Sequence, residues 1–192
     1  PLLTGMENYL GYPVTMFSVS TYAALARAVA DETVDVAVLS GKLAVDAVQK
    51  HGMCVTARVR RGADADGYYA ALVTRIQGPR STLSALLADL DSWRLARGEP
   101  DSLTGFIIPQ LDFFFAHGVD METRFAGEFV GTHQEVMLAV ANGEADLGAT
   151  NTADLERFAR RFPRESRLLH VIWASTRPAT SFIVMRCSLG EP

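Results

Sequence analysis

Short apolar runs alternate with capped helical stretches along this 192-residue chain, and the alternation constrains its fold more than any other feature. Ser and Thr stand where several helices are expected to begin, and Gly stands where several end. These residue types satisfy backbone groups that have no intrahelical partner at helix ends. Strands that alternate with helices are typical of parallel sheets covered by helices, so the sequence predicts an α/β fold.

The pattern gives an ordered set of elements. We expect helices over residues 1–10, 22–31, 42–50, 81–90, 106–117, 133–142 and 153–162. We expect strands over residues 14–19, 34–39, 53–59, 68–76, 93–96, 125–130, 145–149, 168–174 and 181–187. A polar loop is expected at 60–67 and a break at Gly78-Pro79. A long strand crossing between two sheets near Tyr69 would make the protein bilobal and hinged.

Two stretches share one local pattern. His133 lies 111 residues after Tyr22, and Asn151 lies 111 residues after Ser40. Each stretch reads as a capped helix, a turn and a short strand with one Asp. Such units are common in α/β proteins, so the match is weak evidence of duplication. It predicts two similar lobes, each directing a helix N-terminus at a shared cleft.

Composition excludes several classes of function. The formal net charge of −4 and the pI near 5.6 do not indicate the basic surface that nucleic-acid binding needs. No apolar stretch is long enough to span a bilayer, and no signal-peptide pattern is present. Cys54 and Cys187 have no metal-ligand spacing, so we expect no metal site. Each cysteine lies in an apolar run, which favours buried free thiols, with one disulfide as the alternative.

Two stretches are candidates for binding an anion. Ser102-Leu103-Thr104-Gly105, just before a predicted helix, offers two hydroxyl groups and free amides, although a plain helix cap would need only one hydroxyl. Thr132 and Glu135 form a capping box that places His133 in the first turn of a helix, where unpaired amides attract anions. The positive helix end disfavours imidazolium, so a neutral His133 is expected.

Support for catalysis is weak. The sequence has no nucleophile elbow, no His-Glu metal spacing and no Walker loop. Asp35 and Asp146 occupy equivalent strand positions and are interpreted as structural. Tyr68 and Tyr69 follow a glycine at the proposed crossing. Because strand neighbours point in opposite directions, we expect one side chain to face the cleft and the other to pack against the protein. The alternative is that both are ordinary core or surface aromatics. We therefore expect a binding protein, with no catalytic residues and no cofactor.

Taken together, these motifs resemble the substrate-binding proteins of phosphonate and phosphite ABC importers, a group of the type II periplasmic binding proteins. The family pattern Asp-Pro-x-Ser-Thr-Ser-Gly-(Tyr/Phe)-Leu-Val-Pro reads Glu-Pro-Asp-Ser-Leu-Thr-Gly-Phe-Ile-Ile-Pro here, over residues 99–109. Further matches to the family are Tyr22–Ala24, Val34–Ala37, Gly67-Tyr68, Gly131–His133, Leu138–Asp146, Ala149–Asn151 and Val171–Ser175.

The resemblance implies an anion held between the lobes by hydroxyl groups, His133 and the amides before the Gly105 helix. Three positions depart from the family. Leu103 replaces a hydroxyl donor, Leu39 beside Ser40 stands where a Tyr is common, and Ser181 stands where a carboxylate is usual. Loss of that carboxylate disfavours aminoalkyl phosphonates as ligands. The expected ligand-binding residues are Tyr68, Ser102, Leu103, Thr104, His133, Ser40, Leu39 and Ser181.

The resemblance also implies an architecture and a setting. We expect two parallel-rich sheets flanked by helices, with a first lobe of residues 1–70 plus 180–192 and a second of 71–179. Family members have a strand before Pro1 and helices after Pro192, so an incomplete first lobe is expected. The implied location is periplasmic or extracytoplasmic, and the implied partner is an ABC permease. A sensory domain of the same fold, or an enzyme on this fold, is the alternative.

Overall fold

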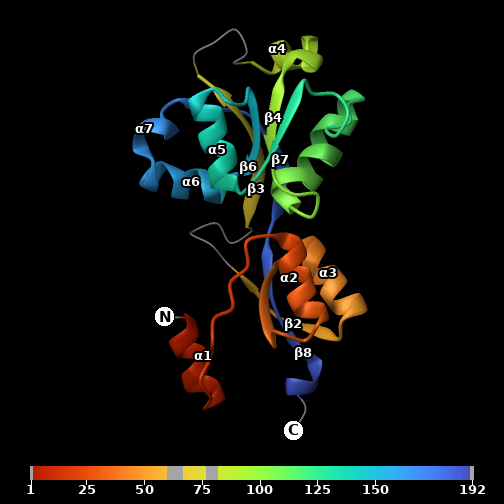
Figure 1. The fold of residues 1–192 in the computed structure, drawn as a ribbon, viewed down its shortest axis with the longest axis vertical. Helices are drawn as coiled ribbons and strands as arrows, with labels where there is room; N and C mark the ends of the chain where they lie inside the picture. The colour runs from red at the N-terminus through yellow and green to blue at the C-terminus, as the bar shows by residue number, and fades with distance from the viewer. Residues whose placement is uncertain (1, 60–66, 77–81, 191–192) are drawn as a thin grey trace.

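Two sheets, each covered by helices, form two lobes joined by two chain crossings (Figure 1). The computed structural model describes residues 2–59, 67–76 and 82–190. Residues 60–66 of the loop predicted over 60–67, the break at Gly78-Pro79 and the predicted start of a helix at Ser81 lie outside the described residues. Among the residues described, no helix is long and apolar enough to cross a membrane.

The elements follow the predicted alternation closely. The α-helices are α1 (Leu2–Leu10), α2 (Tyr22–Ala30), α3 (Gly41–Lys50), α4 (Leu83–Ala88), α5 (His133–Asn142), α6 (Thr152–Arg161) and α7 (Pro163–Ser166). The predicted helix over 106–117 is formed by the π-helical turns η2 (Leu103–Ile107) and η3 (Pro109–Phe114) and the 3₁₀ turn η4 (Phe115–His117). The other 3₁₀ turns are η1 (Leu90–Ser92) and η5 (Cys187–Gly190).

The strands are β1 (Val36–Ser40), β2 (Met53–Val59), β3 (Tyr68–Arg75), β4 (Arg94–Arg97), β5 (Gly127–Val130), β6 (Leu147–Asn151), β7 (Leu169–Ala179) and β8 (Ser181–Arg186). The strand predicted over 14–19 is wrong, because this segment pairs with no strand among the described residues and is mostly exposed. It connects α1 to α2 along the outside of the smaller lobe (Figure 1).

The smaller sheet has the order β1-β8-β2, and both of its pairings are antiparallel. The parallel-rich prediction is therefore wrong for this sheet. β1 and β2, which α3 connects, do run in the same direction, as a helical crossover requires. However, β8 returns from the other lobe and lies between them in the opposite direction.

The larger sheet has the order β5-β4-β6-β3-β7, with two parallel pairings around β4 and two antiparallel pairings around β3. Here too a helix, α5, connects two strands of the same direction, and another strand lies between them. α5 packs on one face through its buried Val136 and Val140, and the buried Phe113 and Phe114 of η3 pack on the other. The larger sheet is thus covered on both faces (Figure 1).

One disulfide bond links Cys54 of β2 to Cys187 of η5, across a sequence separation of 133 residues. The favoured prediction of buried free thiols is therefore wrong. Cys54 is exposed and Cys187 is half-buried, because both lie near the end of the smaller sheet that is remote from the larger lobe. The apolar runs around them had suggested burial, but the side chain at 54 points away from the core.

The crossings between the lobes meet where Gly67 and Tyr68 approach Ala179. Tyr68 pairs with Ala179, and β8 begins at Ser181, opposite Val59 of β2. β3 pairs within the larger sheet along its whole length, so the sheet begins three residues before the predicted lobe boundary at 70/71. The lobe bounds themselves stay a prediction.

Replacing Gly67 with alanine is expected to destabilise the protein by about 1–3 kcal/mol, the usual cost of strain at a glycine-only conformation. Gly67 has φ +125°, and a Cβ there would lie 2.2 Å from the carbonyl oxygen of Ala179. Gly52→Ala is the control, because Gly52 also has a positive φ of +64° but no atom lies within 4 Å of its added Cβ. Chemical denaturation compares the two. Equal losses of unfolding free energy would show that the close approach at the crossing is unimportant.

Candidate functional site

A cavity of about 520 Å³ lies between the lobes. The smaller lobe contributes Tyr22, Leu25, Val38, Ser40 and Ser181 to its wall. The larger lobe contributes Tyr68, Leu103, Thr104, Thr132, His133, Gln134, Met137, Asn151, Ala153, Asp154, Arg157, Phe158 and Arg161. The cavity is thus the shared cleft that the two similar sequence stretches predict.

Four α-helices begin at this cavity, two from each lobe. Tyr22 and His133 are the first residues of α2 and α5, and Ser40 and Asn151 are the N-caps of α3 and α6. These are the two pairs that the 111-residue spacing relates. The first amides of a helix have no intrahelical partners and carry the positive end of the helix dipole. Their convergence favours a negatively charged ligand.

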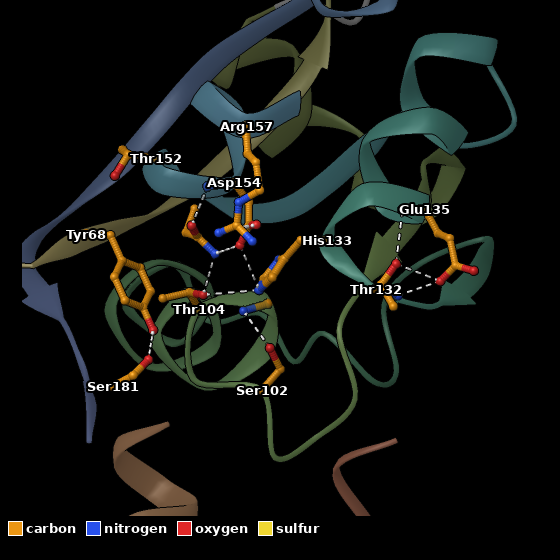
Figure 2. Close-up of polar contacts among 12 residues, drawn as sticks. Tyr68, Ser102, Thr104, Thr132, His133, Glu135, Thr152, Asp154, Arg157 and Ser181 are labelled. Atoms are coloured by element: carbon orange, nitrogen blue, oxygen red, sulfur yellow. Dashed lines mark hydrogen bonds and ion pairs between the residues drawn. The ribbon is translucent and has the colours of Figure 1, made fainter. Parts of the chain in front are cut away.

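Hydroxyl and imidazole groups meet on the larger-lobe side of the cavity (Figure 2). Asn151 Nδ2 donates to Thr104 Oγ1 at 3.1 Å, and Thr104 Oγ1 lies 3.4 Å from His133 Nε2. Because Thr104 Oγ1 already accepts a hydrogen bond, its proton remains available to donate. Asp154 lies beside this group, accepting from Asn151 Nδ2 at 2.8 Å and lying 4.0 Å from His133 Nε2.

The His133 ring is largely buried, with 18% of its side chain exposed. Burial lowers the pKa of His133, and this effect outweighs the carboxylate of Asp154, which raises it. Nδ1 is buried and makes no hydrogen bond of ordinary geometry among the described residues, and a contact with the Ala149 backbone raises the pKa by less than burial lowers it. A neutral imidazole, as the sequence predicts, can donate one N–H to an anion without bringing a second formal charge into the site.

The lowered pKa of His133 predicts a pH dependence of stability. The unfolded chain binds this proton more tightly than the folded protein does. The contribution of His133 to folding stability is therefore complete above the His pKa of the unfolded chain, about 6.5, and is lost as the pH falls below it. We expect the melting temperature to fall less steeply below pH ~6.5 in His133→Gln than in the unmodified protein. His51→Gln, outside this cavity, is the control and keeps the steep slope. Parallel slopes in all three proteins would contradict the prediction.

Hydroxyl groups also lie at the crossing between the lobes. The Tyr68 hydroxyl and Ser181 Oγ are 3.3 Å apart, and both residues line the cavity. Ser40 Oγ is buried, makes no capping bond to α3 and has no partner among the described residues. A buried hydroxyl without a partner is costly, so a ligand that accepts its proton would be favoured.

The structure brings six of the eight predicted site residues to the cavity: Ser40, Tyr68, Leu103, Thr104, His133 and Ser181. Leu39 is 2% exposed and packs in the core of the smaller lobe, so it does not reach the cavity. Its neighbours Val38 and Ser40 line the cavity instead, because adjacent strand residues point to opposite faces.

Ser102 lies beside the main cavity, in a neighbouring pocket of about 420 Å³. Its buried Oγ accepts from the Gly105 amide at 3.1 Å and so caps η2. This is the helix-cap role that the sequence offered as the alternative to anion binding. Ser102 also hydrogen-bonds the Tyr22 side chain, whose pKa is raised by burial. Glu99 accepts from the Tyr22 amide at 3.1 Å, so the start of α2 is held against this loop of the larger lobe.

Four polar cavity residues of β6 and α6 were not predicted: Asn151, Asp154, Arg157 and Arg161. Asn151 was matched to the family and paired with Ser40 by the 111-residue spacing, but it was not assigned to the site. The other three lie on one face of α6, at spacings of three and four residues. Their stretch looked like an ordinary charged surface helix. Tyr22 was matched to the family but was not assigned to the site.

Comparison with known proteins identifies the family of this chain. Residues 1–191 match the family model described as the ABC transporter, phosphonate, periplasmic substrate-binding protein. The chain is 29% identical over 191 residues to the phosphonates-binding periplasmic protein of Escherichia coli, covering 100% of this chain and 56% of that protein.

Solved structures show the same fold. A binding protein component of an ABC phosphonate transporter from Pseudomonas aeruginosa superposes with a TM-score of 0.91 at 28% identity, covering 97% of this chain and 62% of that one. A Prochlorococcus marinus protein in complex with methylphosphonate gives a TM-score of 0.81 at 21% identity, covering 98% and 70%. The chain thus spans less than two thirds of the first two relatives. By its sequence and its bilobal α/β fold, it belongs to the family of periplasmic substrate-binding proteins of phosphonate ABC transporters.

Proposed function

We propose that the cavity binds a phosphonate, a phosphite or a related phosphorus oxyanion. The observation that carries the proposal is the convergence of four helix N-termini with the Ser40, Thr104 and Ser181 hydroxyls and the buried His133 on one cavity. Such a site supplies many N–H and O–H donors for oxygen acceptors. Asp154, the one carboxylate that lines the main cavity in the described part of the chain, lies 3.1 Å from the Arg157 guanidinium.

The protein would serve as the solute-binding component of an importer and would perform no chemistry. The lobes would close over the anion by bending at the crossings near Gly67 and Ala179 and would present it to an ABC permease. We propose a periplasmic or extracytoplasmic location. The Cys54–Cys187 disulfide supports it, because disulfides persist in oxidising compartments.

A thermal-shift and calorimetric panel tests the proposal. The ligands are phosphate, phosphite, methylphosphonate and aminoethylphosphonate, with sulfate as a tetrahedral oxyanion without phosphorus. A ligand at about 100 times its Kd stabilises the folded protein by about 2.7 kcal/mol, which is easily detected. We expect at least one phosphorus oxyanion to bind and sulfate to bind more weakly. If no phosphorus oxyanion raises the melting temperature, the proposed function is wrong.

A further inference from the structure

Two arginines of α6 line the cavity beyond the hydroxyl groups. Arg157 and Arg161 are four residues apart and so lie on one face of the helix. The Arg157 side chain is 55% exposed, and Arg161 is also exposed. Figure 2 shows the Arg157 guanidinium directed toward Asp154 and the neighbouring His133. These charges lie in the wall of the cleft and are accessible to a ligand.

The partners of the two guanidinium groups leave positive charge available. Arg157 Nη2 lies 3.1 Å from Asp154 Oδ1, and that carboxylate also accepts from Asn151. Arg161 Nη1 donates to the neutral amide oxygen of Gln134 at 3.0 Å, and its guanidinium lies 5.5 Å from the centre of the Phe162 ring. A guanidinium has five N–H donors, so most of the donors of both side chains remain for a ligand.

Charge on this wall therefore favours an anion over a cation. Two guanidiniums and one carboxylate line this wall, and the carboxylate of Asp154 is paired with Arg157. A ligand ammonium placed here would lie beside two like charges, whereas a carboxylate would match the planar fork of an arginine. Buried Met137 and Phe158 also line the cavity and offer apolar surface for a short hydrocarbon chain.

We propose that the preferred ligand is a phosphonate whose organic part ends in a second anionic group, a carboxylate. The phosphonate would lie among the hydroxyl groups and helix N-termini, and the carboxylate would contact Arg161 and Arg157. A cavity of about 520 Å³ has room for such a molecule, since small-molecule pockets typically measure about 300–1,000 Å³. The inference rests on the proposed function, because it concerns the other end of the same ligand.

Three ligands of similar length test the inference by calorimetry: phosphonopropionate, propylphosphonate and aminoethylphosphonate, whose distal ends are anionic, neutral and cationic. We expect phosphonopropionate to bind about tenfold tighter than propylphosphonate, the effect of roughly one charge-assisted hydrogen bond. Aminoethylphosphonate is expected to bind most weakly. Equal or tighter binding of the neutral or cationic ligand would overturn the inference, and methylphosphonate binding would show that the proposed function still stands.

Arginine variants test whether the tighter binding of phosphonopropionate depends on the α6 side of the cavity. Arg161→Ala is expected to remove most of the advantage of phosphonopropionate and to leave the Kd for propylphosphonate within about twofold. Its neighbour Arg160 does not line the cavity, so Arg160→Ala removes the same charge from the helix and is expected to keep the advantage. Arg157→Gln also exposes Asp154 and should weaken both ligands.

The variants separate the two proposals. An advantage of phosphonopropionate that persists in both Arg161→Ala and Arg157→Gln would overturn the inference. Arg161 is exposed, so its loss should leave the melting temperature unchanged, and this is measured alongside. If none of the phosphonates binds the unmodified protein, the proposed function fails and the inference fails with it.

Discussion

Replacing His133 with alanine or Thr104 with valine is expected to weaken binding of a phosphorus oxyanion roughly tenfold to hundredfold. Both side chains line the cavity, and their polar atoms lie 3.4 Å apart. A hydrogen bond to a charged group is worth about 1.5–3 kcal/mol, which corresponds to that loss. Valine keeps the shape of threonine and removes only its hydroxyl. Calorimetric titration of each variant with the ligand that binds best measures the change.

Thr82→Val is the matched control for the threonine variant. Thr82 accepts from the amide of Ala85 as the N-cap of α4 and does not line the cavity. It is expected to lose some stability, about 1 kcal/mol, and no affinity. Because His133 and Thr104 are neighbours, the double variant should lose less than the sum of the single losses. Unchanged affinity in both single variants would remove these two residues from the binding site.

Loss of the Cys54–Cys187 disulfide is expected to lower the free energy of unfolding by about 2–5 kcal/mol. The bond closes a loop with a sequence separation of 133 residues, so its removal gives the unfolded chain much more freedom. For a domain of this size, that corresponds to a fall in melting temperature of roughly 5–20 °C. Unfolding of the Cys54→Ala/Cys187→Ala variant in denaturant measures the change.

Reduction of the unmodified protein provides an independent comparison. The reductant should lower the stability of the unmodified protein toward that of the double-alanine variant and leave the variant itself unchanged. Because the disulfide lies at the far end of the smaller sheet, ligand affinity should change little in protein that stays folded. A double-alanine variant as stable as the unmodified protein would contradict the role given to this bond.

Local capping chemistry made most of the helices predictable from the sequence. Thr132 caps α5 as predicted, and its capping box with Glu135 is present; α2 is capped by Thr21, one of the two hydroxyl residues before its start. Sheet pairing was harder to predict, because a helix between two strands fixes only their relative direction. It does not reveal that β8, from the far end of the chain, lies between β1 and β2. Nonlocal pairing of this kind leaves no signal in the local pattern.

The site was predictable where a motif places backbone amides and less so where a helix face supplies side chains. Ser40, Thr104 and His133 all lie at or near helix starts, which the sequence marks. Arg157 and Arg161 lie within a helix whose charged face looked like solvent-exposed surface. Only the packing of α6 beside the cleft makes this face part of the cavity wall. The prediction of Leu39 as a site residue is wrong, because the alternation along β1 directs its side chain into the core of the smaller lobe.

The most direct test of the account is a crystal structure of the protein with methylphosphonate bound. We predict the phosphonate in the cavity between the lobes, with its oxygens within hydrogen-bond distance, about 2.7–3.2 Å, of Ser40 Oγ, Thr104 Oγ1 and a nitrogen of His133. The lobes should lie closer together than in the unliganded protein. A phosphonate bound elsewhere, or held in the cleft without contact to these three side chains, would contradict the account.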